Sequence, residues 1–146
     1  YGFPTDRLLF EMTESEQIRN PDHALSIVRD YKQRGFQTAI DDFGAGYSGL
    51  NLLAQFQPDI VKLDMALTRG IDTDKVRVAI VDGVIRTCTA LGCKVVAEGI
   101  ESAGEAVTLH RLGVGLFQGY WFAKPALEAL PQVDLAPFRA AWAAAG

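Results

Sequence analysis

Short apolar runs alternate with longer amphipathic stretches along the 146-residue chain. Five runs have the β-branched and aromatic character of strands, and we expect strands at residues 7–13, 37–43, 59–65, 93–100 and 115–122. Between them, apolar residues recur three or four positions apart, which predicts helices over residues 21–34, 48–55, 74–91 and 102–112. An alanine-rich stretch predicts a further helix over 133–146.

Three glycines support this division, because Gly35, Gly92 and Gly113 each fall just past a predicted helix. A helix often ends with a left-handed residue, and glycine adopts that conformation without a clash from a Cβ atom. The alternation of strands and helices is typical of repeated βα units around a parallel sheet. No linker or low-complexity segment interrupts it, so we expect one α/β domain across residues 1–146.

Polar residues gather at the carboxyl ends of the predicted strands. These are Glu11 and Glu14, Asp41 and Asp42, Lys62 and Asp64, Glu98 and Glu101, and Gln118. Any one of these acids could simply cap a following helix. In a parallel α/β barrel, however, all strand ends converge on one rim, which carries the active site. Lys62 and Asp64 also alternate with Val61 and Leu63, which predicts that both face the same side of a strand.

The adjacent acids Asp41 and Asp42 indicate a cation, because crowded like charges raise each other's pKa unless a cation separates them. Carboxylates from several strands form a hard oxygen site that suits Mg²⁺ or Mn²⁺, and Ca²⁺ could occupy it without supporting catalysis. Two such cations can clamp a phosphodiester and activate water. A metal-assisted enolising site, in which Lys62 abstracts a proton, is an alternative for the same residue types.

The histidines, the cysteines and the net charge narrow the range of functions that the chain could have. His23 and His110 fall in predicted helices, where we expect surface or packing roles, and Cys88 and Cys93 lack the partners of a zinc site. We therefore expect reduced structural thiols and a cytoplasmic protein. The net charge of −4 disfavours binding to a nucleic acid polymer, and no apolar stretch is long enough to span a membrane.

Five motifs, in this order and spacing, resemble the C-terminal part of EAL domains, the bacterial cyclic di-GMP phosphodiesterases. They are "FEMTES", "AIDDFGAGYSGL", "DIVKLD", "VVAEGIES" and "FQGYWFAKP", within about residues 7–126. The resemblance implies a partial TIM-like (β/α) barrel of about five βα units. It also implies hydrolysis of cyclic di-GMP to linear pGpG at a two-metal site with Mg²⁺ or Mn²⁺.

The resemblance also implies roles for the site residues. Glu11 would be a metal ligand, Asp41 would be shared between two metals, and Asp42 would bind the second. Lys62 would position the attacking water, and Glu98 would be the general base or a second-metal ligand.

Further residues would support this site. Asp64, Glu101 and Gln118 would steady it, and Glu14 would tether the loop that Asp42 opens. That loop, residues 43–50 with Phe43, Gly44, Gly46 and Ser48, would couple formation of a homodimer to metal and substrate binding.

The resemblance leaves part of the domain unaccounted for. The family's signature Glu-Ala-Leu stretch and a metal-binding Asn should lie before Tyr1, and neither is found within these residues. The stretch "ALEAL" at 126–130 is not that signature, because it follows the last predicted strand. The first residues lack an initiator Met and a signal core, so we expect a piece of a longer polypeptide, inactive without the upstream half of its barrel. Sensor domains would lie outside these residues. A non-catalytic cyclic di-GMP receptor or protein-interaction module is the alternative function.

Overall fold

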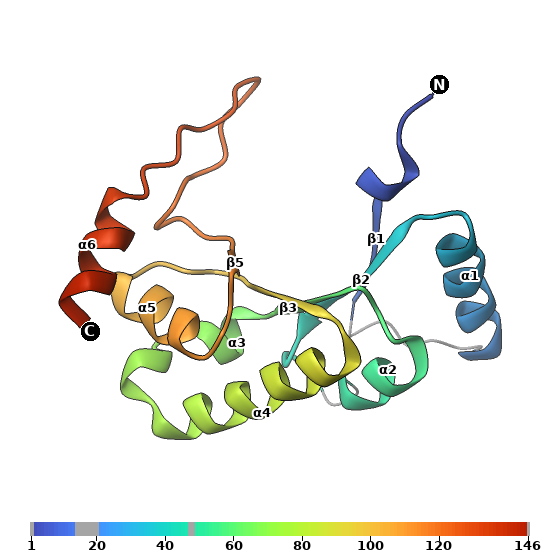
Figure 1. Ribbon diagram of the computed structural model, residues 1–146, viewed down its shortest axis with the longest axis horizontal. Coiled ribbons are helices and arrows are strands. Elements are labelled where there is room, and N and C mark those ends of the chain that lie inside the picture. The colour runs from blue at the N-terminus through green and yellow to red at the C-terminus, as the bar shows by residue number, and fades with distance from the viewer. Residues whose placement is uncertain (1, 14–20, 47–48, 146) are drawn as a thin grey trace.

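The computed structural model describes residues 2–13, 21–46 and 49–145 and contains one five-stranded sheet. All of its strands are parallel and pair in sequence order (Figure 1). They are β1 (Leu9–Thr13), β2 (Gln37–Phe43), β3 (Ile60–Leu63), β4 (Lys94–Ala97) and β5 (Leu116–Phe117). This arrangement confirms the prediction of an α/β protein built from consecutive βα units.

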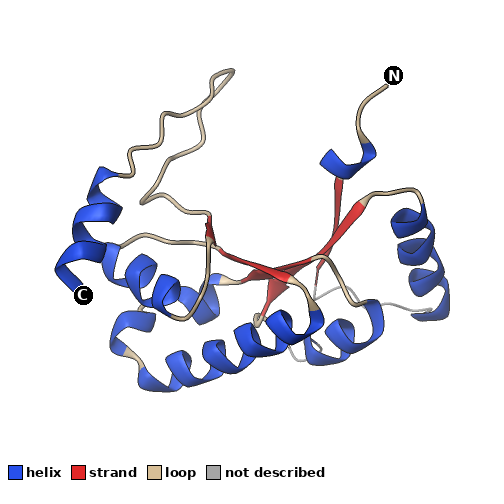
Figure 2. Cartoon of the chain, in the orientation of Figure 1, coloured by secondary structure: helices blue, strands red, loops and turns tan. Residues whose placement is uncertain are grey.

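The helices cover one face of this sheet, as Figure 2 shows for α2, α4 and α5. The longer helices are α1 (Pro21–Gln33), α2 (Gly49–Phe56), α4 (Lys75–Leu91), α5 (Ala103–Arg111) and α6 (Ala136–Ala145). A four-residue helix, α3 (Met65–Thr68), and two 3-10 turns, Thr5–Arg7 and Ile71–Thr73, complete the described elements. None of the helices in the described ranges has the length and hydropathy that crossing a membrane requires.

The core lies between the sheet and these helices. Val61 and Leu63 of β3 are completely buried in one hydrophobic cluster with Val81 and Ile85 of α4. Because successive strand residues point to opposite faces, Lys62 between them points away from the core. The sheet therefore presents Lys62 on the face that α2, α4 and α5 leave open.

Several predicted strands are longer than the observed ones. The strand predicted at 59–65 ends at Leu63, because Asp64 accepts a hydrogen bond from the Ala66 N–H at 2.8 Å and thereby caps α3. The strand predicted at 115–122 contains only two strand residues, and the one predicted at 93–100 ends at Ala97. Short strands followed at once by turns carry too little pattern to fix their ends.

The predicted helix ends agree better with the structure. Gly35, Gly92 and Gly113 all adopt positive φ angles, as C-terminal caps do.

The terminal helix begins at Ala136 instead of residue 133, and its Trp142 packs edge-on against His110 with ring centroids 4.5 Å apart. This contact confirms a packing role for His110.

The remaining histidine and the cysteines also lie as expected. His23 is exposed on α1, which confirms its prediction as a surface residue. Cys88 and Cys93 are buried and free, as expected for structural thiols. Burial raises the pKa of the Cys88 thiol to about 11, so this thiol is protonated at neutral pH.

Gly119 permits a close backbone contact next to β5. A Cβ atom at this position would lie 2.2 Å from the Ile100 carbonyl oxygen and 2.3 Å from its nitrogen. The Ile100 N–H donates to the Gln118 carbonyl oxygen at 3.1 Å, and the Trp121 N–H donates to the Ile100 carbonyl oxygen at 3.0 Å. Gly119 therefore lets the segment after β5 lie against the segment after β4.

We predict that Gly119→Ala lowers the free energy of unfolding by about 1–3 kcal/mol, because backbone atoms must move to admit the methyl group. Gly115→Ala is the matched control, because a Cβ atom there meets nothing within 4 Å. Urea unfolding of both variants measures the difference. Equal stabilities would contradict the close contact.

Candidate metal centre

A β-bulge at the end of β2 places Asp41 and Asp42 together. Ile40 pairs with Val61 and Phe43 pairs with Leu63, so both aspartates stand opposite the single residue Lys62. Regular alternation would send neighbouring side chains to opposite faces, whereas a bulge redirects one of them. Asp42 has a φ of 55°, in the left-handed region that aspartate tolerates better than most residues.

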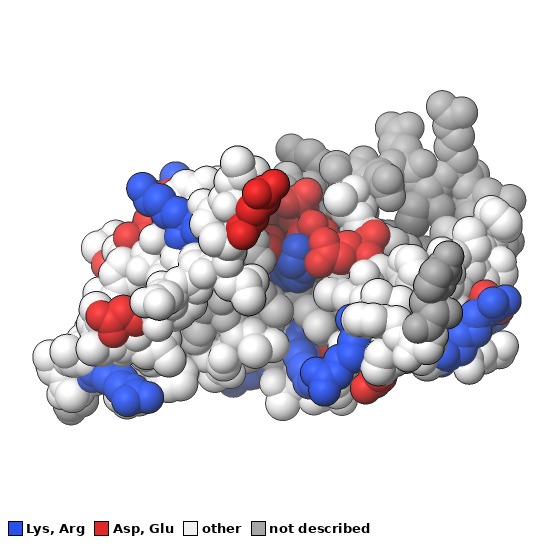
Figure 3. All heavy atoms as spheres, turned by 90° about the horizontal axis from the view of Figure 1, so that it is seen from above, with Lys and Arg blue, Asp and Glu red and all other residues white. Residues whose placement is uncertain are grey.

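Lys62 lies at the centre of a cluster of carboxylates. Its Nζ atom is 2.8 Å from Asp41 Oδ1, 3.0 Å from Glu98 Oε1 and 3.2 Å from Glu11 Oε1. These acids come from β2, the residue after β4, and β1, and the Lys62 side chain is only 13% exposed. Figure 3 shows acidic groups gathered around basic atoms in a hollow near the middle of one face.

The cluster changes the acidity of its members in different directions. Burial alone would lower the pKa of Lys62, but hydrogen bonds to Asp41, Glu98 and Glu11 outweigh it and raise the pKa above its ordinary value. Burial raises the pKa of Glu98, and Lys62 only partly opposes this effect. For Asp41, the hydrogen bonds from Lys62 and the Asp42 N–H outweigh burial and lower the pKa. Lys62 is therefore charged at neutral pH.

The negative charge of Asp42 is balanced less well by its neighbours than that of Asp41. Burial raises the pKa of Asp42, and the negative charges of Asp41 and Asp64 raise it further. The neighbouring aspartates therefore differ, with Asp41 paired to Lys62 and Asp42 facing other acids. A divalent cation would relieve this repulsion.

The donor atoms fit such a cation. Asp41, Asp42 and Glu98 each offer a carboxylate oxygen, and these oxygens all lie within 4.8 Å of one another. Carboxylates of this kind suit Mg²⁺, Mn²⁺ and Ca²⁺. With Glu11 they carry more negative charge than Lys62 balances. The residues present therefore fit the metal that the motifs led us to expect.

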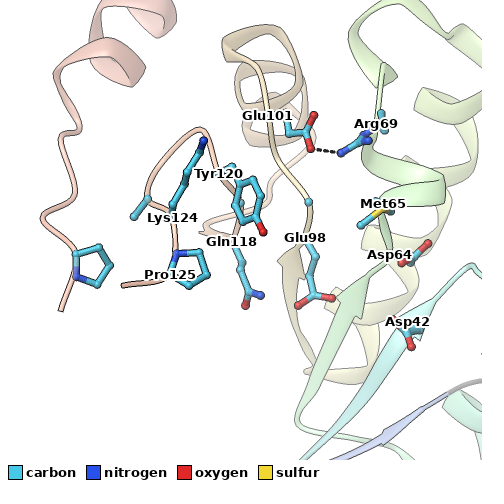
Figure 4. A pocket seen from close by; sticks show the side chains of 14 residues that line it. Asp42, Asp64, Met65, Arg69, Glu98, Glu101, Gln118, Tyr120, Lys124 and Pro125 are labelled. Atoms are coloured by element: carbon cyan, nitrogen blue, oxygen red, sulfur yellow. Dashed lines mark hydrogen bonds and ion pairs between the residues drawn. The ribbon is translucent and has the colours of Figure 1, made fainter. Parts of the chain in front are cut away.

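A cavity of about 500 Å³ opens beside the cluster. Asp42, Asp64, Glu98 and Gln118 line it, and Glu98 and Gln118 point the same way from neighbouring strand ends (Figure 4). Tyr120 is exposed at its wall, where the Lys124 ammonium group lies 5.7 Å from the ring centre. The cavity thus joins carboxylates with an aromatic ring.

The cavity also contains an ion pair between its lining residues. Arg69 donates from Nη2 to Glu101 Oε1, and both side chains are about half exposed (Figure 4). Arg69, Tyr120 and Lys124 are not among the site residues predicted from the sequence. Tyr120 and Lys124 belong to the quoted motif "FQGYWFAKP", whereas Arg69 follows α3, which the periodicity did not predict.

The structure brings most of the predicted site residues together. Glu11, Asp41, Lys62 and Glu98 form the cluster and Asp42 adjoins it, while Asp64, Glu101 and Gln118 line the cavity. Glu14 and Ser48 lie outside the described residues.

The described part of the predicted loop lies away from this cavity. Phe43 is buried in the core, while Gly44 and Gly46 line a separate cavity of about 320 Å³ with Leu50 and Ile80. Gly44 has a φ of 102°, and a Cβ atom there would lie 2.3 Å from Leu67 Cδ1.

The parallel sheet and its acidic carboxyl-end rim are typical of part of an α/β barrel with a candidate metal centre. A model of the EAL domain matches residues 1–125, and the chain belongs to the EAL domain family.

Among curated proteins, the chain is similar to the cyclic di-GMP phosphodiesterase PdeR of Escherichia coli (strain K12). The two are 43% identical over 115 residues, which are 79% of this chain and 17% of that protein. The chain is also similar to the blue light- and temperature-regulated antirepressor BluF of the same organism. The two are 37% identical over 128 residues, which are 88% of this chain and 32% of BluF. The chain therefore spans a third or less of these relatives.

Among solved structures, the chain is similar to a standalone versatile EAL protein from Vibrio cholerae O395 in its c-di-GMP bound form. The TM-score is 0.87 at 50% identity, covering 92% of this chain and 57% of that one. The Klebsiella pneumoniae BlrP1 manganese/cy-diGMP complex at pH 6 has a TM-score of 0.85 at 43% identity, covering 90% of this chain and 34% of that one. These likenesses confirm a partial EAL-type barrel.

We predict that Lys62→Met lowers the free energy of unfolding by about 1–3 kcal/mol, because it leaves partly buried carboxylates facing one another without their cation. Lys94→Met on neighbouring β4 is the control, because Lys94 is exposed and lies at the start of its strand. Urea unfolding without divalent cations makes the comparison. Equal losses in the two variants would show that Lys62 has no special electrostatic role.

Proposed function

We propose that this chain supplies the carboxyl-end rim of a metal-dependent phosphodiesterase that hydrolyses cyclic di-GMP to linear pGpG. The observation that carries the proposal is that carboxylate oxygens of Asp41, Asp42 and Glu98 all lie within 4.8 Å of one another. Asp41 and Glu98 also contact Lys62. The choice of substrate is supported by relatives named cyclic di-GMP phosphodiesterases, PdeR among them. Solved EAL structures that hold the dinucleotide with manganese or calcium also support it.

Asp41, Asp42 and Glu98 are the residues that would hold Mg²⁺ or Mn²⁺, with Glu11 close by on the other side of Lys62. Bound cations of this kind polarise a phosphoryl oxygen and lower the pKa of water.

Lys62 and Glu98 have complementary roles in the proposed reaction. The raised pKa keeps Lys62 protonated, so it takes no proton, and one of its three N–H groups, all of which face carboxylates here, would turn to hold the attacking water. Burial raises the pKa of Glu98, and Glu98 would accept the proton of that water if it acts as the general base and not as a ligand of the second metal. The water oxygen then bonds to phosphorus, the bond to the sugar oxygen breaks, and that oxygen takes up a proton from solvent to become the hydroxyl group of the linear product.

The cavity suits the two parts of a dinucleotide. The exposed Tyr120 ring offers a stacking surface for a base, and Arg69 and Lys124 are the basic residues that line the cavity. The acids on its floor would repel a phosphate unless cations neutralised them. The cavity therefore supports a phosphodiester substrate only together with the metal centre.

Hydrolysis also needs the rest of a barrel. Within the described residues, β1 pairs only with β2 and β5 pairs only with β4, so each has an open edge. Leu9 and Leu116 of these edge strands are partly exposed. We propose that further strands cover these surfaces, and that residues 1–146 alone are inactive.

We predict that linear pGpG forms from cyclic di-GMP with Mg²⁺ or Mn²⁺, and not with Ca²⁺, in a longer chain that carries the complete family domain. Asp41→Asn should lower the rate at least about 100-fold, because it removes a ligand charge. Asp30→Asn is the control, because Asp30 forms an ion pair with Arg34 on α1, away from the cluster. Chromatography of the products measures the outcome.

A second candidate is a cyclic di-GMP receptor or protein-interaction module that does not hydrolyse its ligand. It is favoured by the likeness to BluF, which is named as an antirepressor. Tight binding of cyclic di-GMP by the longer chain without product would support this candidate and contradict the phosphodiesterase.

We also propose a homodimer through α2 and α4. Leu50, Val76 and Ile80 are 66%, 68% and 49% exposed, and Leu50 and Ile80 line the cavity next to Gly44 and Gly46. Exposed apolar groups that lie together indicate a protein interface. Contacts at this surface would bear directly on the loop that follows Asp42.

We predict that Ile80→Asp raises the dimer dissociation constant at least about tenfold, because it places an unpaired charge in the interface. Ile27→Asp on α1 is the control, since Ile27 is a partly exposed apolar residue on another helix. Light scattering over a concentration series measures both. A dimer that Ile80→Asp leaves intact would rule out this surface.

A further inference from the structure

Thr68 links the short helix α3 to the residue that follows β4. It is the last residue of α3, and it is completely buried. Its hydroxyl group donates a hydrogen bond to the Glu98 carbonyl oxygen at 2.7 Å. Glu98 is a member of the candidate metal centre, whereas Thr68 itself does not line the cavity.

This hydrogen bond falls where the sheet ends. The Glu98 N–H donates to the Leu63 carbonyl oxygen at 3.1 Å, which continues the ladder between β3 and β4. The next residue, Gly99, has a φ of 65° and turns the chain away from the strand direction. Thr68 binds the Glu98 carbonyl oxygen at this turn, so both backbone polar groups of Glu98 are fixed.

Packing holds the same turn against α3. A Cβ atom on Gly99 would lie 2.8 Å from the Met65 Cβ atom, so the first turn of α3 touches the backbone directly. Only a glycine combines this approach with the left-handed conformation. The turn therefore cannot move without moving α3.

A buried carboxylate fixes the far end of this contact. Glu105 accepts hydrogen bonds from the N–H groups of Gly70, Glu101 and Ser102, at 2.8, 2.9 and 3.0 Å. Gly70 follows α3, and the other two residues precede α5. The segment from Glu98 to Ser102 is thus tied to α3 and its exit at both ends.

We propose that Thr68 is a positioning residue that fixes the Glu98 carboxylate relative to Asp41 and Asp42. This inference rests on the proposed function, because it assigns to Thr68 a role toward the metal that those acids would hold. Lys62 contacts the Glu98 side chain at 3.0 Å, and Thr68 binds the Glu98 backbone carbonyl oxygen at 2.7 Å. Without the hydroxyl group, the carboxylate loses its fixed distance to the aspartates, and affinity for a cation falls.

The test is the affinity of the full-length protein for Mn²⁺ without substrate, measured by electron paramagnetic resonance of the free ion. Thr68→Val removes the hydroxyl group and keeps the shape, and we expect it to weaken Mn²⁺ binding about tenfold. Thr68→Ser keeps the hydroxyl group and should stay within about twofold of the parent protein. Thr68→Ala has the same expectation as Thr68→Val and replaces it if that variant does not fold.

Thr38→Val is the matched control. Thr38 is also a buried threonine, and its hydroxyl group donates to Asp59 Oδ2 at 2.9 Å near the opposite end of the strands. Both valine variants should lose stability in urea, but only Thr68→Val should lose Mn²⁺ affinity. A mere loss of stability would affect the two variants alike.

Two failures can be told apart. If Thr68→Val binds Mn²⁺ as tightly as the parent protein while Asp41→Asn does not, the inference is wrong and the metal centre stands. If Asp41→Asn also leaves the affinity unchanged, the proposed metal centre is wrong, and the role of Thr68 falls with it.

Discussion

The Lys62 ammonium group lies between carboxylates that come from three different strands or strand ends, and their mutual repulsion would oppose folding without it. Its position follows from simple alternation, since Val61 and Leu63 enter the core and leave Lys62 on the other face. The burial of Val61 and Leu63 therefore sets the position of the Lys62 ammonium group, and this group in turn attracts the surrounding carboxylates. A single amine cannot balance all of them, which is the physical reason for expecting a divalent cation beside it.

The two ends of the sheet have different roles. At the amino-terminal end, Asp59 Oδ2 accepts hydrogen bonds from both the N–H and the hydroxyl group of Thr38, at 2.8 and 2.9 Å. The backbone of Asp59 also bonds to both neighbouring strands, through the Thr38 carbonyl oxygen and the Lys94 N–H. Here an acid is paired with donors within the chain. At the carboxyl end, acids instead face one another. Stability and chemistry are thus separated along the strands, as in other parallel α/β barrels.

The sequence predicted the alternating elements well, because the helices carry a clear apolar period and because Gly35, Gly92 and Gly113 mark the ends of α1, α4 and α5. It missed α3, since four residues are too short to show a period. It also predicted Asp64 as a strand residue, because Lys62 and Asp64 alternate with apolar neighbours. In the structure the Asp64 side chain binds the Ala66 N–H and begins a helix instead. Local hydrogen bonding of this kind competes with strand pairing and leaves no trace in hydrophobicity.

The sequence was enough to predict which residues form the candidate site, but not how the backbone arranges them. Strand ends and the five motifs identified Glu11, Asp41, Lys62 and Glu98, and all of them meet. The bulge could not be foreseen, because a regular strand would place Asp41 and Asp42 on opposite faces. Nor could the buried link from Thr68 to Glu98, since it joins residues 30 positions apart through a helix that the pattern did not show.

The left-handed backbone of Asp42 has a consequence for telling family members apart. Asparagine and glycine accept this conformation as readily as aspartate does, so either could replace Asp42 and leave the bulge in place. Such a chain would superimpose on this one along its whole backbone and still lack a negative charge. Within this family, similarity of shape therefore does not report the charge at the bulge, which depends on the identity of the side chain at this position.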